Sequence, residues 1–122
     1  MVLSNLGILL ADTGATGEAL SVLRKSLEID PRQVAARMKL VQLLLLGDDF
    51  RAAEDEAHIL TDTAPNDAAA WNLLGVALAS QQRLEPARTA FAKAVALDPG
   101  LAEARQNLTH IDDKIGKRRT AP

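Results

Sequence analysis

The stretch that decides the fold runs from residue 68 to residue 101 and reads AAAWNLLGVALASQQRLEPARTAFAKAVALDPGL. Its apolar residues Trp71, Leu74 and Leu78 recur at intervals of three and four, which is the spacing of one face of an α-helix. Polar residues at 80–83 interrupt the pattern, and a second apolar run follows. Pro99 ends that run because proline clashes with the preceding helical turn. The stretch is therefore predicted to form a helical hairpin.

The same pattern recurs toward the N-terminus at an offset of 34 residues. Four columns hold identical residues in three successive units, and these are Leu6, Leu40 and Leu74; Leu10, Leu44 and Leu78; Ala19, Ala53 and Ala87; and Pro31, Pro65 and Pro99. An internal period of this length is typical of stacked helical units. It predicts helices over residues 1–12, 16–29, 34–46, 50–62, 68–80, 84–97 and 101–115.

The offset also continues toward the C-terminus. Ala102, Ala104 and Leu108 fall in the apolar columns of a fourth unit, whereas Asp112 falls in a Leu column. A helix with one apolar face and one polar face is what the end of a repeat array requires. Residues 102–115 are therefore predicted to be a capping helix that Gly116 ends, and residues 116–122 a flexible basic tail.

The residues that carry a family resemblance are Trp71, Leu74, Gly75, Leu78, Ala87, Phe91, Ala94 and Pro99. This set resembles the tetratricopeptide signature, with Leu78 where the family usually has Tyr. The middle unit departs from the signature at Arg37 and Val41. The resemblance implies an all-α fold, a right-handed α-solenoid of three helix-turn-helix repeats (1–33, 34–67 and 68–101) with a C-terminal capping helix. Residues 1–115 would then form one domain.

Composition and charge exclude several classes of function. The chain has no cysteine, so disulfides, Cys-ligated metals and thiol nucleophiles are excluded. A net charge of -2 makes nucleic acid an unsuitable main ligand. No run reaches the roughly 18 apolar residues of a membrane span. We expect no nucleic-acid or membrane partner and a cytoplasmic location, with the periplasm left open. The basic residues Lys114, Lys117, Arg118 and Arg119 are interpreted as a solvated terminus, with an acidic partner or a membrane surface as the alternative.

No catalytic constellation is found. His58 and His110 lie far apart in the sequence and lack a second ligand at metal-binding spacing. The segment 14–17 contains two glycines but lacks the Lys and the preceding strand of a phosphate-binding loop. We therefore predict no enzyme activity, no metal and no cofactor.

The resemblance implies a partner-binding groove lined by the first helix of each hairpin. The positions that match such a groove are Ser4, Ile8, Met38, Gln42, Leu45, Asn72, Val76, Gln106 and His110. A chaperone-type carboxylate clamp would require basic and Asn side chains at Ser4, Ile8, Lys39, Ala69 and Leu73. Only Lys39 has that chemistry, so the clamp is rejected.

The sequence thus predicts a non-catalytic module that binds a peptide or helix of a partner protein in its groove. Two alternatives stay open: a self-association element, and the docking portion of a longer enzyme or complex-assembly protein. We expect Leu6 to pack inside its own hairpin, whereas Val2, Ile8 and Leu9 lie where an earlier repeat would partly cover them. This apolar N-terminal edge predicts a weak homodimer.

Overall fold

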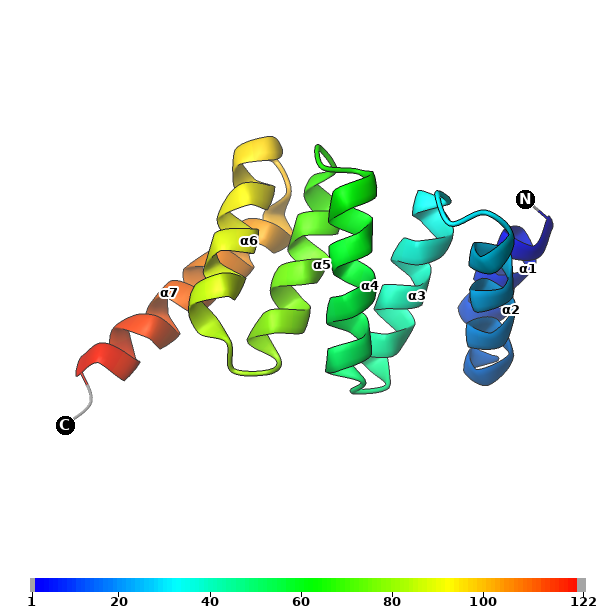
Figure 1. Ribbon diagram of the computed structural model, residues 1–122. Helices are drawn as coiled ribbons and strands as arrows, with labels where there is room; N and C mark the ends of the chain where they lie inside the picture. Colours follow the sequence, from blue (N-terminus) through cyan, green and yellow to red (C-terminus); the bar gives the residue numbers. More distant parts are fainter. Residues whose placement is uncertain (1, 121–122) are drawn as a thin grey trace.

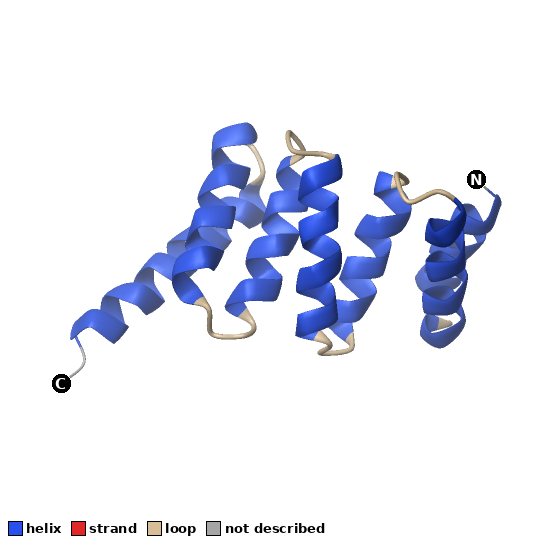
Figure 2. Cartoon of the chain, in the orientation of Figure 1, coloured by secondary structure: helices blue, strands red, loops and turns tan. Residues whose placement is uncertain are grey.

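The computed structural model describes residues 2–120, and that range contains seven α-helices and no strand. Consecutive helices form antiparallel hairpins that stack side by side (Figure 1), joined by short loops (Figure 2). The helices are α1 (Val2–Asp12), α2 (Thr16–Ile29), α3 (Val34–Leu46), α4 (Phe50–Thr63), α5 (Ala68–Ala79), α6 (Leu84–Leu97) and α7 (Ala102–Thr120). The predicted all-α, right-handed solenoid of three hairpins and a capping helix is confirmed.

The helices form two layers. The first helices of the hairpins, α1, α3 and α5, lie in one layer with α7, and the second helices α2, α4 and α6 lie in the other (Figure 1). The core fills the space between the layers and includes the Ala column, in which Ala19, Ala53 and Ala87 are fully buried. We call the outer surface of α1, α3, α5 and α7 the first-helix face.

Each hairpin is closed by one small and one larger side chain that face each other. A Cβ atom on Gly7 would lie 2.7 Å from the side chain of Leu23, and one on Gly75 would overlap the ring of Phe91. The middle hairpin has Val41 and Ala57 at the equivalent positions, both fully buried. In this hairpin the larger side chain, Val41, is on the first helix and the smaller one, Ala57, is on the second. This exchange explains why Val41 departs from the Gly column.

The three hairpin turns also share one backbone feature. Gly14, Asp48 and Gln82 occupy the same repeat position, and their φ angles are 88°, 60° and 61°. This left-handed conformation closes the helix end: the N–H of Ala15 reaches the carbonyl of Leu10 at 2.9 Å, as the Schellman geometry requires. The turns are thus equivalent although only the first has a glycine at the left-handed position.

Arg37 and Trp71 occupy equivalent positions and make the same contact. Trp71 Nε1 donates a hydrogen bond to the carbonyl of Pro65 at 2.8 Å, and Arg37 Nη2 donates to the carbonyl of Pro31 at 3.0 Å. Arg37 is buried and also pairs with Glu56. Arg37 therefore departs from the sequence signature but makes the same hydrogen bond to the turn between repeats as Trp71 does.

A buried carboxylate connects the second and third hairpins. Glu54 on α4 is 7% exposed and accepts two hydrogen bonds from Arg83, at 2.8 and 2.9 Å, and one from Gln81 at 2.9 Å. His58 Nε2 lies 3.0 Å from the same carboxylate. Burial raises the pKa of Glu54, but these hydrogen bonds and the charge of Arg83 outweigh burial and hold the pKa below its ordinary value.

The capping helix is longer than predicted. α7 continues through Gly116 to Thr120, so the predicted helix end at 115 and the flexible tail from 116 are wrong for residues 116–120. Residues 121–122 lie outside the described residues. Ile115 is 6% exposed, Arg119 pairs with Glu85 at 3.0 Å, and cations in the last turn favour the helix dipole. These contacts offset the helix propensity that Gly116 lacks.

The N-terminal edge differs from the expectation at Leu6, which is 42% exposed together with Val2 at 81% and Leu9 at 59%. The equivalent positions in the next repeat, Ala36, Leu40 and Leu43, are all buried on α3, which both helices of the first hairpin contact. No helix in the described range precedes α1, so its stripe of Val2, Leu6 and Leu9, here named the α1 stripe, is open.

The Val41 and Ala57 pair gives a test by double-mutant cycle. We expect Val41→Gly to destabilise the protein by about 2–4 kcal/mol and Ala57→Leu by about 1–3 kcal/mol. The double variant should lose less than the sum, by about 0.5–3 kcal/mol, because the new Leu fills the space over Gly. Urea unfolding measures all four free energies. Val41→Gly with Ala87→Leu, in another hairpin, should be additive; additivity at 41 and 57 would contradict the pairing.

Glu54 predicts a pH-dependent stability. A carboxyl whose folded-state pKa is lowered stabilises the fold above its unfolded-state pKa, and this contribution is lost as pH falls through the folded-state pKa, below the ordinary value of 4.5. Glu54→Gln should therefore lower the free energy of unfolding by about 1–3 kcal/mol at pH 7 and by much less at pH 3. Urea midpoints at both pH values measure this. Asp55→Asn, an exposed neighbour, is the control; an equal Glu54→Gln effect at both pH values would refute the assignment.

Candidate functional site

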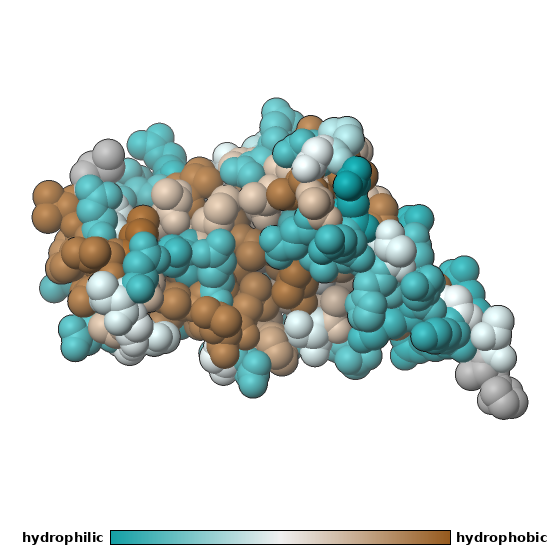
Figure 3. Space-filling model, turned by 180° about the vertical axis from the view of Figure 1, so that it is seen from behind, coloured by the Kyte–Doolittle hydropathy of each residue, from teal (hydrophilic) through white to brown (hydrophobic). Residues whose placement is uncertain are grey.

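The first-helix face is the candidate binding surface. Figure 3 shows it from the side opposite to Figure 1: apolar residues gather over the N-terminal half and the centre, and polar residues gather toward the C-terminal end. The face therefore has an apolar part formed by α1, α3 and α5 and a polar part formed by α7. A peptide laid across it would meet both chemistries.

The structure places the nine predicted groove residues in three classes. Ile8, Leu45 and Val76 are half-buried and pack on the core with one side. Met38 is half-buried without belonging to that core cluster. The exposed members are Gln42, Gln106 and His110, and the buried members are Ser4 at 7% and Asn72 at 4% exposure.

Asn72 is therefore not the exposed groove residue that the family resemblance implies. Its Oδ1 accepts a hydrogen bond from Asn107 Nδ2 at 2.9 Å, and this bond joins α5 to α7. The capping helix covers the position, so the amide serves packing. Ser4, also expected to line the groove, is likewise buried, so that expectation is wrong as well. Sequence reasoning missed Asn107 because the exact position of the cap on α5 does not follow from the repeat period.

Lys39 is the one basic residue at a clamp position, and it is already engaged. Its Nζ lies 3.2 Å from Asp12 Oδ1, and the Lys39 side chain is 26% exposed. The pair links α3 to the end of α1. The rejected carboxylate clamp has no other cation at its positions, and the structure neutralises this one.

A pocket lies between α5 and α7 and brings two predicted residues together. Its volume is about 220 Å³, and Val76 and His110 both line it. The full lining is Val76, Ala79, Ser80, Gln82, Phe91, Asn107, His110, Ile111 and Lys114. Lys114, one turn after His110, could have been found from its spacing. Phe91 could not, because it reaches the pocket from the other layer through the gap left by Gly75.

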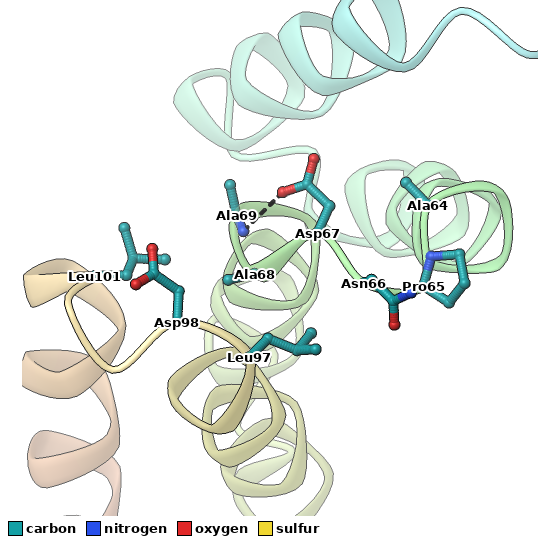
Figure 4. A pocket seen from close by; sticks show the side chains of 9 residues that line it. All are labelled: Ala64, Pro65, Asn66, Asp67, Ala68, Ala69, Leu97, Asp98 and Leu101. Carbon is teal, nitrogen blue, oxygen red and sulfur yellow. Dashed lines mark hydrogen bonds between the residues drawn. The ribbon is translucent and has the colours of Figure 1, made fainter.

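A larger and more open cleft of about 740 Å³ lies at the edge, between two turns that join repeats (Figure 4). The carboxylates of its two acidic residues accept hydrogen bonds from backbone N–H groups. Asp67 Oδ1 accepts a hydrogen bond from the N–H of Ala69 at 3.0 Å, and Asp98 Oδ1 accepts one from Gly100 at 3.0 Å. These carboxylates cap a helix and a turn, so the cleft has few polar groups left for a ligand.

The described part of the chain has neither a metal-binding cluster nor a membrane-spanning helix. No group of three or more His, Asp or Glu residues there is arranged to hold a metal ion. No helix within residues 2–120 is both long enough and apolar enough to cross a bilayer.

Comparison with known proteins identifies the family. Two family models described as tetratricopeptide repeat match the chain, one over residues 10–77 and one over residues 68–101. The chain is similar to the peroxisomal targeting signal receptor of Kluyveromyces lactis, at 34% identity over 89 residues, or 73% of this chain and 15% of the relative. It is also similar to the peroxisomal targeting signal receptor of Saccharomyces cerevisiae, at 35% identity over 88 residues, which are 72% of this chain and 14% of the relative. The chain thus spans a small part of the length of these relatives.

Solved structures of similar fold support the same family assignment. MamA 41-end from Desulfovibrio magneticus RS-1 superposes with a TM-score of 0.87 at 30% identity, covering 97% of this chain and 67% of that chain. The first TPR of Spaghetti (RPAP3) bound to the HSP90 peptide SRMEEVD gives a TM-score of 0.90 at 22% identity, covering 94% of this chain and 91% of the other. The chain therefore belongs to the tetratricopeptide repeat family and is a protein–protein interaction module.

Proposed function

We propose that the module binds a peptide or helix of a partner protein across the apolar part of the first-helix face. The carrying observation is that three successive first helices each present a half-buried apolar side chain there: Ile8 on α1, Met38 on α3 and Val76 on α5. Partner atoms that cover the exposed parts of such side chains gain the hydrophobic free energy of burial, about 25 cal/mol per Å². Gln42 is exposed beside Met38 and offers an amide for orientation.

Met38 is the best candidate for the centre of the contact. Its thioether is flexible, and it does not belong to the core cluster, so it can adapt to a ligand without disturbing the fold. Binding in this way requires no chemical step, and we propose a non-catalytic role. The HSP90 peptide bound to the Spaghetti domain, a fold neighbour, is consistent with peptide binding by such an array.

A selected peptide tests the groove. A displayed library of random peptides is panned on the wild-type chain, and the affinities of the recovered peptides are measured by fluorescence anisotropy. We expect Met38→Glu to raise the Kd at least about tenfold, or about 1.4 kcal/mol, because a charge replaces an apolar contact. Arg51→Gln, an exposed substitution on α4 with the same change in net charge, should leave the Kd unchanged. Equal effects of both variants would refute the groove assignment.

A second candidate function is self-association through the α1 stripe. All three of its side chains are exposed, whereas their equivalents in the next repeat are buried. The opposite end of the array, α7, has an exposed polar surface that includes Glu103, Arg105 and Asp112, and it does not complement an apolar stripe. A two-fold contact between two α1 stripes is therefore favoured over head-to-tail stacking, and it gives a weak dimer.

Light scattering over a dilution series tests this dimer. We expect the wild-type mass to rise from monomer toward dimer at micromolar concentrations or above, and Leu9→Lys to suppress the rise. Leu46→Lys adds the same charge at an exposed position outside the stripe and should have no effect. A monomeric mass at the highest concentration that remains in solution would refute self-association.

A further inference from the structure

The pocket between α5 and α7 is small and partly apolar. Phe91 and Ile111, both buried, and the half-buried Val76 and Ala79 supply its apolar surface. Pockets for small molecules usually measure about 300–1,000 Å³. At about 220 Å³ this one is smaller, so a single side chain of a partner fits it better than a cofactor or metabolite.

The mouth of the pocket has positive charge and no negative charge. None of the lining residues is acidic, and Lys114 is the lining residue with a permanent charge. Asp112 lies elsewhere on α7 and pairs with Arg88 at 2.6 Å. Asp113 lines a neighbouring hollow that it shares with Arg105 and His110. The lining itself therefore carries one positive charge, which an anionic group of a ligand would complement.

The positive charge continues along α7 away from the pocket. His110, Lys114, Lys117 and Arg118 are spaced i, i+4, i+7 and i+8, so they share one side of the helix; we call them the basic stripe. Asp113, four residues before Lys117, lies along one edge of this stripe. Within residues 2–120, Lys114, Lys117 and Arg118 form no ion pair, whereas Arg119 on another side of α7 is paired with Glu85. In Figure 1 this end of α7 extends beyond α6, which leaves it accessible.

The length of the basic stripe selects the kind of anion. Arg118 follows His110 by eight steps along the helix, which is about 12 Å at a rise of 1.5 Å per residue. A single terminal carboxylate would meet one cation, whereas several acidic side chains could meet the whole stripe. A membrane surface is a poorer match, because α7 has no exposed large apolar side chain in its described part that could enter a bilayer.

We propose that the pocket and the basic stripe together bind an acidic peptide segment, with one Leu or Phe side chain in the pocket and two or more following Asp or Glu side chains along Lys114, Lys117 and Arg118. This inference rests on the proposed function and specifies the partner chemistry at the C-terminal end of the first-helix face. The apolar anchor supplies the position, and the charges supply selectivity and a dependence on salt.

Four synthetic peptides test the proposal by fluorescence anisotropy. All are acetylated and labelled, and the reference peptide has one Leu followed by three Glu within a Gly-Ser frame and an amidated C-terminus. The second replaces Glu by Gln, the third replaces Leu by Ser, and the fourth has the Gln sequence and ends in Leu with a free carboxylate. At 50 mM salt we expect the reference peptide to bind at least about tenfold more tightly than each of the other peptides. At 300 mM salt it should bind less tightly than at 50 mM.

Two protein variants locate the binding. Lys114→Ala combined with Lys117→Ala should raise the Kd for the reference peptide about tenfold and leave the Kd for the Gln peptide unchanged. Arg24→Ala combined with Lys25→Ala removes the same charge from exposed positions on α2 and should have no effect. Ala79→Leu should block the anchor and weaken the reference peptide, with circular dichroism confirming that the helices are intact.

Each other outcome overturns the proposal. Equal binding of the Glu and Gln peptides, or equal losses in the two double variants, would remove the role of the basic stripe. Tighter binding of the free-acid peptide would assign a terminal carboxylate instead. Binding to phosphatidylserine vesicles without binding to the reference peptide would assign a membrane surface. If library-selected peptides bind in a manner sensitive to Met38→Glu while the reference peptide does not bind, this inference fails and the proposed function stands.

Discussion

The close contact between the two helices of each hairpin is the constraint on which the rest of the structure depends. The small and larger partners alternate as Gly7 with Leu23 and Gly75 with Phe91, and they exchange helices in the middle hairpin. Because each pair sets one small side chain against a larger one, the two helices of every hairpin can approach closely and the hairpins stack. That stacking places Ile8, Met38 and Val76 on a common face, and it carries Phe91 through the layer into the pocket beside α7.

The sequence predicted well whatever depends on local period. The helix bounds, the Ala column and the capping helix follow from spacing and from the Pro positions, and six of the seven helices end within one residue of the expected position. Positions whose environment depends on a neighbouring element were predicted poorly. Leu6 and Leu40 have the same spacing, but only Leu40 has a preceding helix against it. Asn72 belongs to the first-helix face by register, yet α7 buries it.

The candidate site shows the same division. The family resemblance placed Val76 and His110 on one surface, and both line the pocket. It does not identify Lys114 as part of that surface, because the basic residues are interpreted together as a solvated terminus, although Lys114 follows His110 by one turn of the predicted capping helix. The helix beyond residue 115 could not be predicted, because it depends on tertiary contacts made by Ile115 and Arg119. Arg37 shows the reverse case, in which a residue that departs from the signature keeps its hydrogen bond to a proline carbonyl.

The Glu54 cluster has a consequence for how the array opens. In a solenoid each unit contacts only its neighbours, so stability spreads along a row of coupled units, and opening can start at an end. Glu54, Gln81 and Arg83 join the second hairpin to the third, and α7 covers the third, whereas within residues 2–120 no helix covers the outer side of the first hairpin. Local opening should therefore begin with α1 and α2 and can leave α3–α7 folded, so amide hydrogens would exchange fastest at the N-terminal end.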